Sequence, residues 1–380
     1  MENKRYYFDW AASSFGNPSS LHSEGRAAKQ ALEDSRERCA AVLGVPANTL
    51  FFTSGGTESN AISIFSNLVR VGNNRTISSA AEHASVREAM ETLEKMGKPT
   101  GVIPVDPAGR VTPELLAKTL AQYNNIRFAS IMAVNNETGT VTDIPALRDI
   151  IKKHCTQNNL PPIHFHCDIV QAVGKVPVDI SGWDIDSASI SAHKIGGPRG
   201  IGLLYLKRGG KTEVFYKGGG QENNIRGGTE NIQGALALAD CMEKYASPQI
   251  VLANYEQALA RWLKLINALT AIDRCRIIPS CRTELSGSGC RQSDFSPYIL
   301  QAAFKDIPGE VMARALDDLG FAVSTGSACA SYSPERPVLA AMNINENLSI
   351  EGIRISQGFA ATNEEIDLLL NAITEVLKFL

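Results

Sequence analysis

A lysine near the middle of the chain lies between two segments that read as buried strands. Lys194 follows the apolar run 185–192 and precedes a glycine-rich turn at 196–198 and a second apolar run at 201–206. Burial between core strands disfavours the ammonium form, which lowers the pKa of a lysine and makes its amine nucleophilic enough to form a Schiff base. The position therefore predicts that Lys194 anchors an aldehyde cofactor.

A segment rich in serine and glycine, 54–59 (SGGTES), lies between a predicted strand and a predicted helix. Glycines let backbone N–H groups approach an anion closely, and the N-terminus of a helix favours negative charge. The segment around Gly56 and Thr57 is therefore a candidate phosphate cradle. A plain helix N-cap by Thr57 explains the same residues equally well.

Two further polar segments follow predicted strands. His83 comes after the strand 76–79, and the segment 134–139 (VNNETG), which includes Asn136, comes at the end of the strand 128–134. A lone histidine in such a place is more often structural than functional, and a segment rich in Asn and ending in Gly is typical of a turn. Ligands bind outside the carboxyl ends of parallel strands, so both segments are candidates for the site.

The segment 164–171 (HFHCDIVQ) places His164, His166 and Asp168 on one face of a strand, because side chains alternate along it. Two histidines and a carboxylate can hold iron or zinc, so a metal site is one interpretation. That site requires the strand to expose this face to an open pocket. An aspartate at a strand end also suits a pyridinium nitrogen, which needs a buried anion to stay protonated. We favour the second interpretation because Lys194 gives it a partner, and we expect no metal.

The C-terminal third of the chain contributes a thiol and a guanidinium. Cys329 lies in the segment 324–331 (STGSACAS), whose small and polar residues argue against a packed core and indicate a thiol on a loop. Any single cysteine is more often a buried packing residue. Arg354 lies between apolar residues in the segment 352–356 (GIRIS), where a carboxylate is its natural bidentate partner.

Helical and strand-like patterns alternate from residue 22 to about residue 210, which predicts a mainly parallel sheet with helices on both faces. A long helical region follows Gly234 and reaches about Leu269, and the segment 274–380 mixes strands and helices as a smaller α+β domain does. The pattern breaks around Ser247, which predicts a domain boundary there. The predicted strands are 50–53, 76–79, 100–105, 128–134, 163–167, 185–192 and 201–206, and the predicted helices are 26–43, 57–71, 85–95, 113–122 and 144–155.

Composition excludes several classes of protein. At 380 residues the chain exceeds the usual length of a single core, so two unequal domains are expected. A formal net charge of -3 and the lack of a basic run argue against a nucleic-acid partner. The first residues contain no apolar signal core and no window approaches the length of a membrane span, so we expect a cytoplasmic protein. The eight cysteines form no CxxC pair and are expected to be free thiols.

These motifs together resemble the pyridoxal 5'-phosphate (PLP)-dependent cysteine desulfurases of the nitrogen-fixation and iron–sulfur-assembly type, within the class V aminotransferase group. The resemblance implies an α/β fold of the PLP-dependent transferase, aspartate-aminotransferase-like type. A large domain at 15–247 would hold a mainly parallel seven-stranded sheet, and residues 1–14 and 248–380 would form a smaller α+β domain. The matching segments occur in the family's order and cover nearly the whole chain: YFD at 7–9, FGNPSS at 15–20, the segments 54–59 and 134–139, Asp168 with Gln171, SAHK at 191–194, RGGT at 226–229, and the segments around Cys329 and Arg354.

The resemblance also implies a role for each residue that contacts the cofactor. Lys194 forms the Schiff base with PLP and moves protons at the substrate α-carbon, His83 stacks on the pyridine ring, and Asp168 holds the ring nitrogen. Thr57, Ser191 and His193 bind the phosphate, while Gln171 and Asn136 bond the region of the phenolic oxygen or the substrate carboxylate. The complete cofactor-binding set is Gly56, Thr57, His83, Asn136, Asp168, Gln171, Ser191, His193, Lys194 and Thr229.

For the reaction, the resemblance implies that L-cysteine is converted to L-alanine. Arg354, with Asn136, binds the substrate, and Cys329 is the nucleophile that takes the sulfur as a persulfide. Lys194, His83 and Cys329 are thus the expected catalytic residues. The sulfur passes to a scaffold or carrier protein for iron–sulfur cluster or thio-cofactor assembly. Thr229 reaches the phosphate of a neighbouring subunit, which implies a homodimer.

One feature departs from the family. The segment 9–14 runs directly into Phe15, without the helix-length segment that relatives carry between these motifs near the mouth of the active site. Other functions also remain open. A selenocysteine lyase can share every residue named above, an aminotransferase or other class V PLP enzyme does not need Cys329, and a catalytically dead scaffold needs neither Lys194 nor Asp168.

Overall fold

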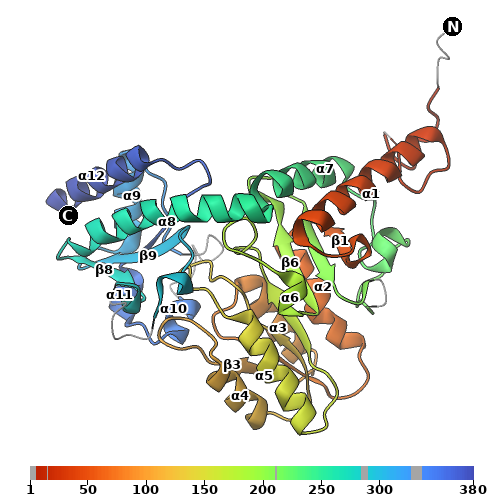
Figure 1. Cartoon of the computed structure of the whole chain (residues 1–380), viewed down its shortest axis with the longest axis horizontal. Helices are drawn as coiled ribbons and strands as arrows, with labels where there is room; N and C mark the ends of the chain where they lie inside the picture. Colours follow the sequence, from red (N-terminus) through yellow and green to blue (C-terminus); the bar gives the residue numbers. More distant parts are fainter. Residues whose placement is uncertain (1–5, 15, 210–211, 284–289, 327–335) are drawn as a thin grey trace.

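A seven-stranded sheet forms the centre of the larger part of the molecule (Figure 1). The computed structural model describes residues 6–14, 16–209, 212–283, 290–326 and 336–380. The strand order is β1-β7-β6-β5-β4-β2-β3. β7 runs antiparallel to its two neighbours, β1 and β6, and all other pairs are parallel, so the predicted mainly parallel sheet of seven strands is confirmed. The strands are β1 (Leu50–Thr53), β2 (Arg75–Ser79), β3 (Thr100–Ile103), β4 (Ile126–Ser130), β5 (His164–Asp168), β6 (Ser187–Ser191) and β7 (Gly202–Leu206).

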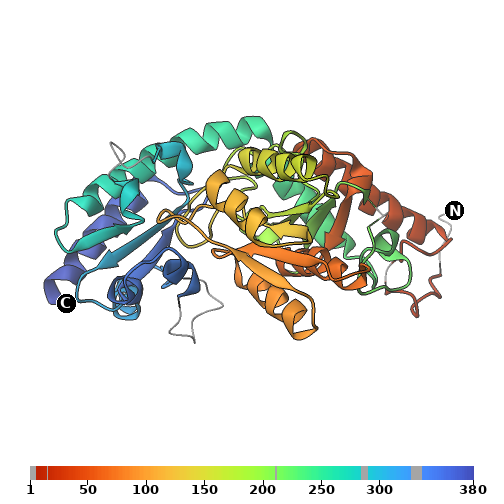
Figure 2. The ribbon, with the colours of Figure 1, turned by 90° about the horizontal axis from the view of Figure 1, so that it is seen from below.

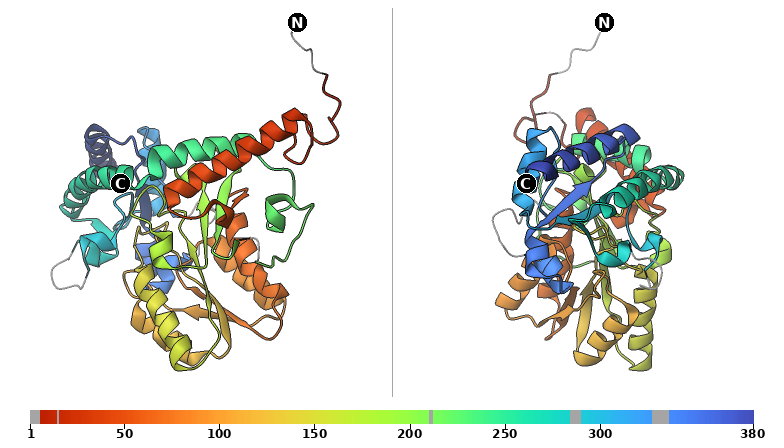
Figure 3. Two further views of the ribbon diagram at one scale, coloured as in Figure 1. Left: turned by 45° about the vertical axis from the view of Figure 1, so that its right-hand side comes forward. Right: turned by 90° about the vertical axis from the view of Figure 1, so that its left-hand side faces the viewer.

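Helices cover both faces of this sheet because its strands present apolar side chains on both sides. Phe128 packs with Ile64 and Val86 on one face, while the next residue, Ala129, belongs to the main core on the other. α2 (Gly56–Val69) and α3 (Ala84–Lys95) cover the first face, and α1 and α7 lie side by side on the second (Figure 3). The helices of the second face are α1 (Ser23–Leu43), α4 (Pro113–Gln122), α5 (Ile144–Gln157), α6 (Ile180–Trp183) and α7 (Ile232–Cys241).

A second, smaller part is built on a three-stranded antiparallel sheet with its own core. The strand order is β10-β9-β8, and Trp262, Leu300 and Ile373 are among the buried residues that join this sheet to its helices. Figure 2 shows α12 and α1 toward opposite ends of the molecule. The elements are α8 (Pro248–Thr270), β8 (Cys275–Ile278), β9 (Ile299–Phe304), α9 (Gly309–Asp318), α10 (Pro337–Ala341), α11 (Glu346–Ile350), β10 (Gly352–Ser356) and α12 (Asn363–Phe379).

The structure shortens several predicted strands, most of all 128–134, and divides one predicted helical region. β4 ends at Ser130, and the chain then turns so that Val134 bridges to Val141, which forms the turn 134–139. The predicted helical region to Leu269 is divided by a π-turn at Met242–Ala246 before Pro248 starts α8. The division into a large domain at 15–247 and a small domain formed by residues 1–14 and 248–380 stays a prediction. No helix within the described ranges combines the length and the apolar character that a membrane crossing needs.

Two glycines allow α2 to begin close to β7. Gly55 precedes α2 with a φ of 150°, and a Cβ on Gly202 would lie 2.6 Å from the Gly55 Cα and would also contact the Ile190 carbonyl oxygen. Real Cβ atoms do not approach backbone atoms this closely, so only glycine fits at position 202. The approach holds the N-terminus of α2 at the carboxyl end of β6.

We predict that Gly202→Ala lowers the free energy of unfolding by about 1–3 kcal/mol, the usual cost of overpacking. Gly358→Ala is the matched control, because a Cβ at Gly358 meets nothing within 4 Å. Urea unfolding of both variants beside the wild type measures the difference. Equal losses for the two variants would show that the contact between Gly55 and Gly202 is not a constraint.

Candidate active site

Two adjoining cavities lie at the carboxyl ends of the parallel strands, where the two sheets approach each other. The first has a volume of about 300 Å³ and the second about 430 Å³. Residues from both parts of the molecule line them, so the fold assembles one site from distant segments. The predicted residues that line the first cavity are Gly56, Thr57, His83, Asn136, Asp168, Gln171, Ser191, His193, Lys194 and Arg354. Those that line both are Asn136, Gln171, His193, Lys194 and Arg354.

Two predicted residues are not placed at these cavities. Thr229 is exposed and lines neither of them. Cys329 lies outside the described residues. None of the other seven cysteines forms a disulfide.

The segment 54–59 forms the N-terminus of α2, as a phosphate cradle requires. The N-cap is Gly55, and no side chain caps the helix. The interpretation of Thr57 as a plain N-cap is therefore wrong. Beside this terminus, the Ser191 hydroxyl lies 2.9 Å from His193 Nδ1. Helix N–H groups, two hydroxyls and an imidazole therefore gather at one point, which suits a phosphate.

Asp168 is a buried carboxylate at the end of β5, and both of its oxygens accept hydrogen bonds. Oδ1 accepts from the backbone N–H of Val170 at 3.0 Å, and Oδ2 accepts from Asn60 Nδ2 at 2.9 Å. Asn60 Nδ2 also donates to Ser85 Oγ at 2.9 Å. Asn60 was not predicted from the sequence. The sequence feature that could have indicated Asn60 is its position one helical turn after Gly56, which points its side chain toward the end of β5.

The two histidines of β5 are engaged in hydrogen bonds that do not suit a metal site. His166 Nε2 bonds Asn60 Oδ1 at 2.9 Å and Nδ1 bonds Ser187 Oγ at 2.8 Å, so both of its ring nitrogens are committed. Burial lowers the pKa of His166 to about 3 and keeps the ring neutral. His164 Nε2 bonds the same Ser187 hydroxyl at 2.7 Å. Among the described residues, no group of three possible ligands is placed to hold a metal.

His83 caps α3 and lines the first cavity. Its Nδ1 accepts the backbone N–H of Ser85 at 3.1 Å and lies 2.8 Å from the Ser85 hydroxyl. Burial lowers the pKa of His83, and the nearby charges of Lys194 and Arg87 lower it further, although Asp168 opposes them. These shifts favour the neutral form of the ring, and its place at the cavity suits stacking on an aromatic cofactor.

Lys194 is exposed, so the prediction that it is buried between strands is wrong. β6 ends at Ser191, and Lys194 lies beyond it in the 3-10 turn Ala192–Lys194, at the edge where both cavities open. The lysine whose amine is removed from water is Lys175, which was not predicted from the sequence. Burial lowers the pKa of Lys175 to about 7, and the charges of Lys194 and Arg354 contribute.

Lys175 also orients a predicted ligand of the cofactor. Its ammonium donates to Gln171 Oε1 at 2.5 Å, across one helical-type turn. Because the carbonyl end of this amide is taken, its Nε2 is left to face another acceptor. The signal available in the sequence was the spacing of four residues between these two polar side chains.

Arg354 joins the smaller part of the molecule to the turn 134–139. Its Nη1 donates to the Asn136 carbonyl oxygen at 3.0 Å, and burial lowers its pKa while Glu137 raises it. Ser324 forms a backbone bridge to Arg354, so the chain that leads toward Cys329 starts beside this guanidinium.

The chain also returns to the same place after the segment that contains Cys329. A Cβ on Gly326 would lie 3.0 Å from Arg336 Nη1 and 3.7 Å from Glu137 Oε2. The last described residue before this segment and the first one after it therefore meet at the turn 134–139.

The comparisons with known proteins agree with this geometry. The family described as aminotransferase class-V matches residues 2–369. The chain belongs to this family. It is 35% identical to "Cysteine desulfurase IscS" of Dictyoglomus turgidum, over 96% of this chain and 88% of the relative. It is 37% identical to a "NifS/IcsS protein homolog" of Lactobacillus delbrueckii subsp. bulgaricus, over 96% and 90% of the two chains.

Solved structures of similar proteins share the whole fold. A structure named "NIFS-LIKE PROTEIN" superposes with a TM-score of 0.83 at 31% identity and covers 96% of this chain and 92% of its own. A NifS-like protein from Rickettsia africae gives a TM-score of 0.79 at 28% identity, with 95% and 92% coverage. The predicted PLP-dependent transferase fold is confirmed.

The cavities of this class-V enzyme fit PLP, the cofactor of the family. Asn136 Oδ1 is buried without a hydrogen-bond partner, which leaves an acceptor for a bound group. A Cβ on Gly56 would lie 2.7 Å from Val170 Cγ2, so glycine keeps the helix terminus open toward the cavity. A buried carboxylate, a neutral imidazole and an accessible amine complete a set that matches the ring nitrogen, ring face and aldehyde of PLP.

We predict that the lowered pKa of Lys175 makes stability depend on pH. The unfolded chain holds this proton up to the ordinary lysine pKa of 10.5, whereas the folded protein loses it at about 7. Between these values the unfolded state binds more protons, so stability rises with pH. The unfolding free energy of the wild type should therefore increase from pH 7 to pH 9.5 relative to that of Lys175→Met.

The exposed Lys153 provides the control for this measurement. Lys153→Met and the wild type should show the same change between the two pH values in urea unfolding. If the unfolding free energy of Lys175→Met changes between the two pH values as that of the wild type does, the ammonium of Lys175 is not destabilised in the folded protein.

Proposed function

We propose that this class-V enzyme is a cysteine desulfurase that takes sulfur from L-cysteine and leaves L-alanine. The observation that carries the proposal is the meeting of Ser324, Gly326 and Arg336 with Arg354 and Glu137 beside the cavities. The segment that contains Cys329 thus leaves from and returns to the site that holds Lys194. Relatives at about one-third identity carry the name cysteine desulfurase, which supports the same conclusion.

The residues of the first cavity would hold the cofactor in a defined orientation. The N-terminus of α2 at Gly56 and Thr57, with Ser191 and His193, would bind the phosphate. The ring nitrogen would lie at Asp168. The remaining contacts would come from His83 on the ring face and from Gln171 and Asn136. Bound PLP supplies an aldehyde for Lys194 and a sink for the electron pair released when a bond to the substrate carbon breaks.

The residues of both cavities would then bind the substrate and move its protons and sulfur. The guanidinium of Arg354 binds the carboxylate of L-cysteine, and Asn136 stands beside it. The amine of Lys194 moves a proton at the substrate α-carbon. The Cys329 thiolate attacks the substrate sulfur, so that a sulfur–sulfur bond forms as the carbon–sulfur bond breaks. The carbon keeps that electron pair and takes a proton, which releases alanine and leaves a persulfide on Cys329.

The persulfide sulfur would pass to a protein acceptor for iron–sulfur cluster or thio-cofactor assembly. A protein acceptor needs access to Cys329, and half-buried Arg336 is the first described residue after the segment that contains it. The predicted cytoplasmic location is compatible with this role, because a reducing compartment keeps the Cys329 thiol free to react.

We predict that Cys329→Ala releases no alanine from L-cysteine above background, whereas Cys241→Ala keeps the wild-type rate. Lys194→Ala should lower the rate by at least about a hundredfold, the lower range for loss of a positioned proton-transfer group. Alanine and sulfide are measured with L-cysteine and a reductant. Full activity of Cys329→Ala on L-cysteine would contradict a desulfurase, and faster turnover of selenocysteine than of cysteine would identify a selenocysteine lyase instead.

We also propose a homodimer in which Thr229 of one subunit contacts the cofactor phosphate bound to the other. The exposure of Thr229 away from both cavities supports a role across an interface. Co-expression of Lys194→Ala with Thr229→Ala tests this arrangement. If Thr229 acts across the interface, one site of each mixed dimer carries neither change, and the mixture is more active than either parent. If it acts within its own subunit, mixing restores nothing.

A further inference from the structure

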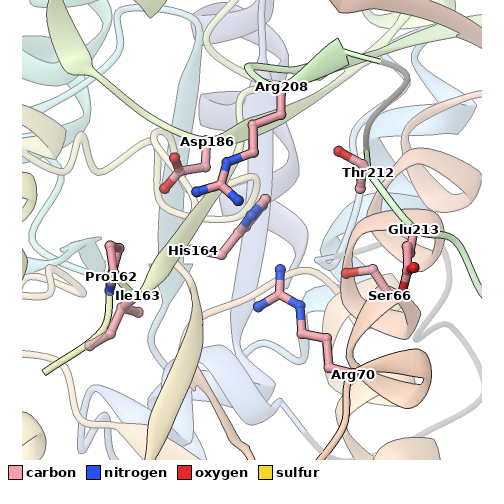
Figure 4. A pocket seen from close by; sticks show the side chains of 9 residues that line it. All are labelled: Ser66, Arg70, Pro162, Ile163, His164, Asp186, Arg208, Thr212 and Glu213. Carbon is pink, nitrogen blue, oxygen red and sulfur yellow. The ribbon is translucent and has the colours of Figure 1, made fainter.

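A third cavity lies at the opposite edge of the large sheet, away from the active site. Its volume is about 240 Å³, and it is lined by the start of β5, the end of α2 and the residues after β7. Figure 4 shows the guanidinium groups of Arg70 and Arg208 pointing toward the ring of His164 from two sides. The cavity is smaller than the roughly 300–1,000 Å³ of sites for drug-sized ligands, so it suits a small ion.

The two arginines of this cavity lack counter-ions. Among the described residues, no carboxylate forms an ion pair with Arg70 or Arg208, whereas Asp186 is paired with Arg148 at 3.1 Å. Burial lowers the pKa of Arg70 and the charge of Arg208 lowers it further, while the charge of Asp186 raises it. Within the described ranges, Arg70 Nη1 donates only to a neutral group, the Arg127 carbonyl oxygen, at 3.2 Å. Two neighbouring cations without a counter-ion destabilise each other, and a bound anion removes that cost.

The two carboxylates that line the cavity, Asp186 and Glu213, offset these charges only in part, because neither forms an ion pair with Arg70 or Arg208 among the described residues. Asp186 Oδ2 also accepts the backbone N–H of Phe165 at 2.9 Å, so this oxygen is committed to the sheet and to Arg148, and the carboxylate shares its one negative charge with Arg148. Glu213 and Arg208 are both exposed, so water and salt screen both of these charges, whereas Arg70 is half-buried and is screened less. The cavity therefore presents two guanidinium groups and an imidazole to a ligand.

The hydrogen bonds behind His164 determine which of its nitrogens carries hydrogen. Asn60 uses its NH2 group for Asp168 and Ser85, so its Oδ1 accepts hydrogen from His166 Nε2. The neutral His166 then accepts at Nδ1 from the Ser187 hydroxyl. Since that hydroxyl has one hydrogen, it must accept from His164 Nε2 at 2.7 Å.

This chain of bonds leaves His164 Nδ1 as an acceptor. Burial and the charge of Arg70 hold the pKa of His164 well below its ordinary value, so the ring is neutral. A ligand that satisfies the whole cavity thus offers negative oxygens to the arginines and one hydrogen to the imidazole. Hydrogen phosphate and hydrogen carbonate have this chemistry, whereas sulfate near neutral pH has no hydrogen to donate.

We propose that the cavity formed by Arg70, His164 and Arg208 binds a small oxyanion that carries an acidic hydrogen. The site is separate from the cofactor site and does not depend on the proposed desulfurase activity. Isothermal titration of the PLP-loaded protein near pH 7 with inorganic phosphate, bicarbonate and sulfate tests it. Filling the cofactor site beforehand prevents phosphate from binding at the N-terminus of α2.

We expect phosphate or bicarbonate to bind, and the tighter of the two identifies the ligand. Arg70→Gln and Arg208→Gln should each weaken binding at least about tenfold, as loss of a charge-assisted bond does. Arg208 is exposed, so its variant should fold even if Arg70→Gln does not. Arg314→Gln is the control, because this side chain is 83% exposed and lies on α9.

Three outcomes would overturn the proposal. The first is that neither phosphate nor bicarbonate binds the wild type. The second is that Arg208→Gln binds as the wild type does. The third is that sulfate binds as tightly as phosphate, because His164 would then not accept a hydrogen from the ligand.

Discussion

The buried carboxylate of Asp168 is the constraint on which the geometry of the active site depends. A charge in the interior must be hydrogen-bonded, and here one of its two bonds comes from Asn60 on α2. The same helix begins at Gly56, one turn earlier, where its N-terminus faces the phosphate position. A single helix therefore sets the distance between the group that holds the ring nitrogen and the groups that hold the phosphate.

The smaller part of the molecule is coupled to this framework through two arginines. Arg354 donates to the Asn136 carbonyl oxygen, and the fully buried Arg282 donates to the Thr138 carbonyl oxygen at 3.0 Å. Arg282 also holds the carbonyl oxygens of Ser296 and Ile299 within its own part. Two arginines of the smaller part therefore hold the turn 134–139 of the larger part by hydrogen bonds. These bonds fix the substrate-binding groups relative to the cofactor-binding groups.

Much of this arrangement could be predicted from the sequence, because strand ends and polar loops mark the binding edge of a parallel sheet. The elements and the residues around the first cavity follow from that rule and from the family motifs. The exposure of Lys194 could not be predicted, because it depends on how loops of the larger and the smaller part of the molecule are arranged around the cavities. Asn60 and Lys175 were also missed, because a polar residue on a helix reveals its role only through its distant partner.

The polar chain from Asp168 through Asn60, His166 and Ser187 to His164 runs along the face of the sheet that α2 covers, with each hydrogen assigned to one acceptor. Replacing one member leaves its neighbour with an unsatisfied donor or acceptor in the core. A second replacement that removes the neighbour's polar group restores the balance. Among relatives, these positions should therefore change together: a relative that differs at one of them should also differ at the position bonded to it.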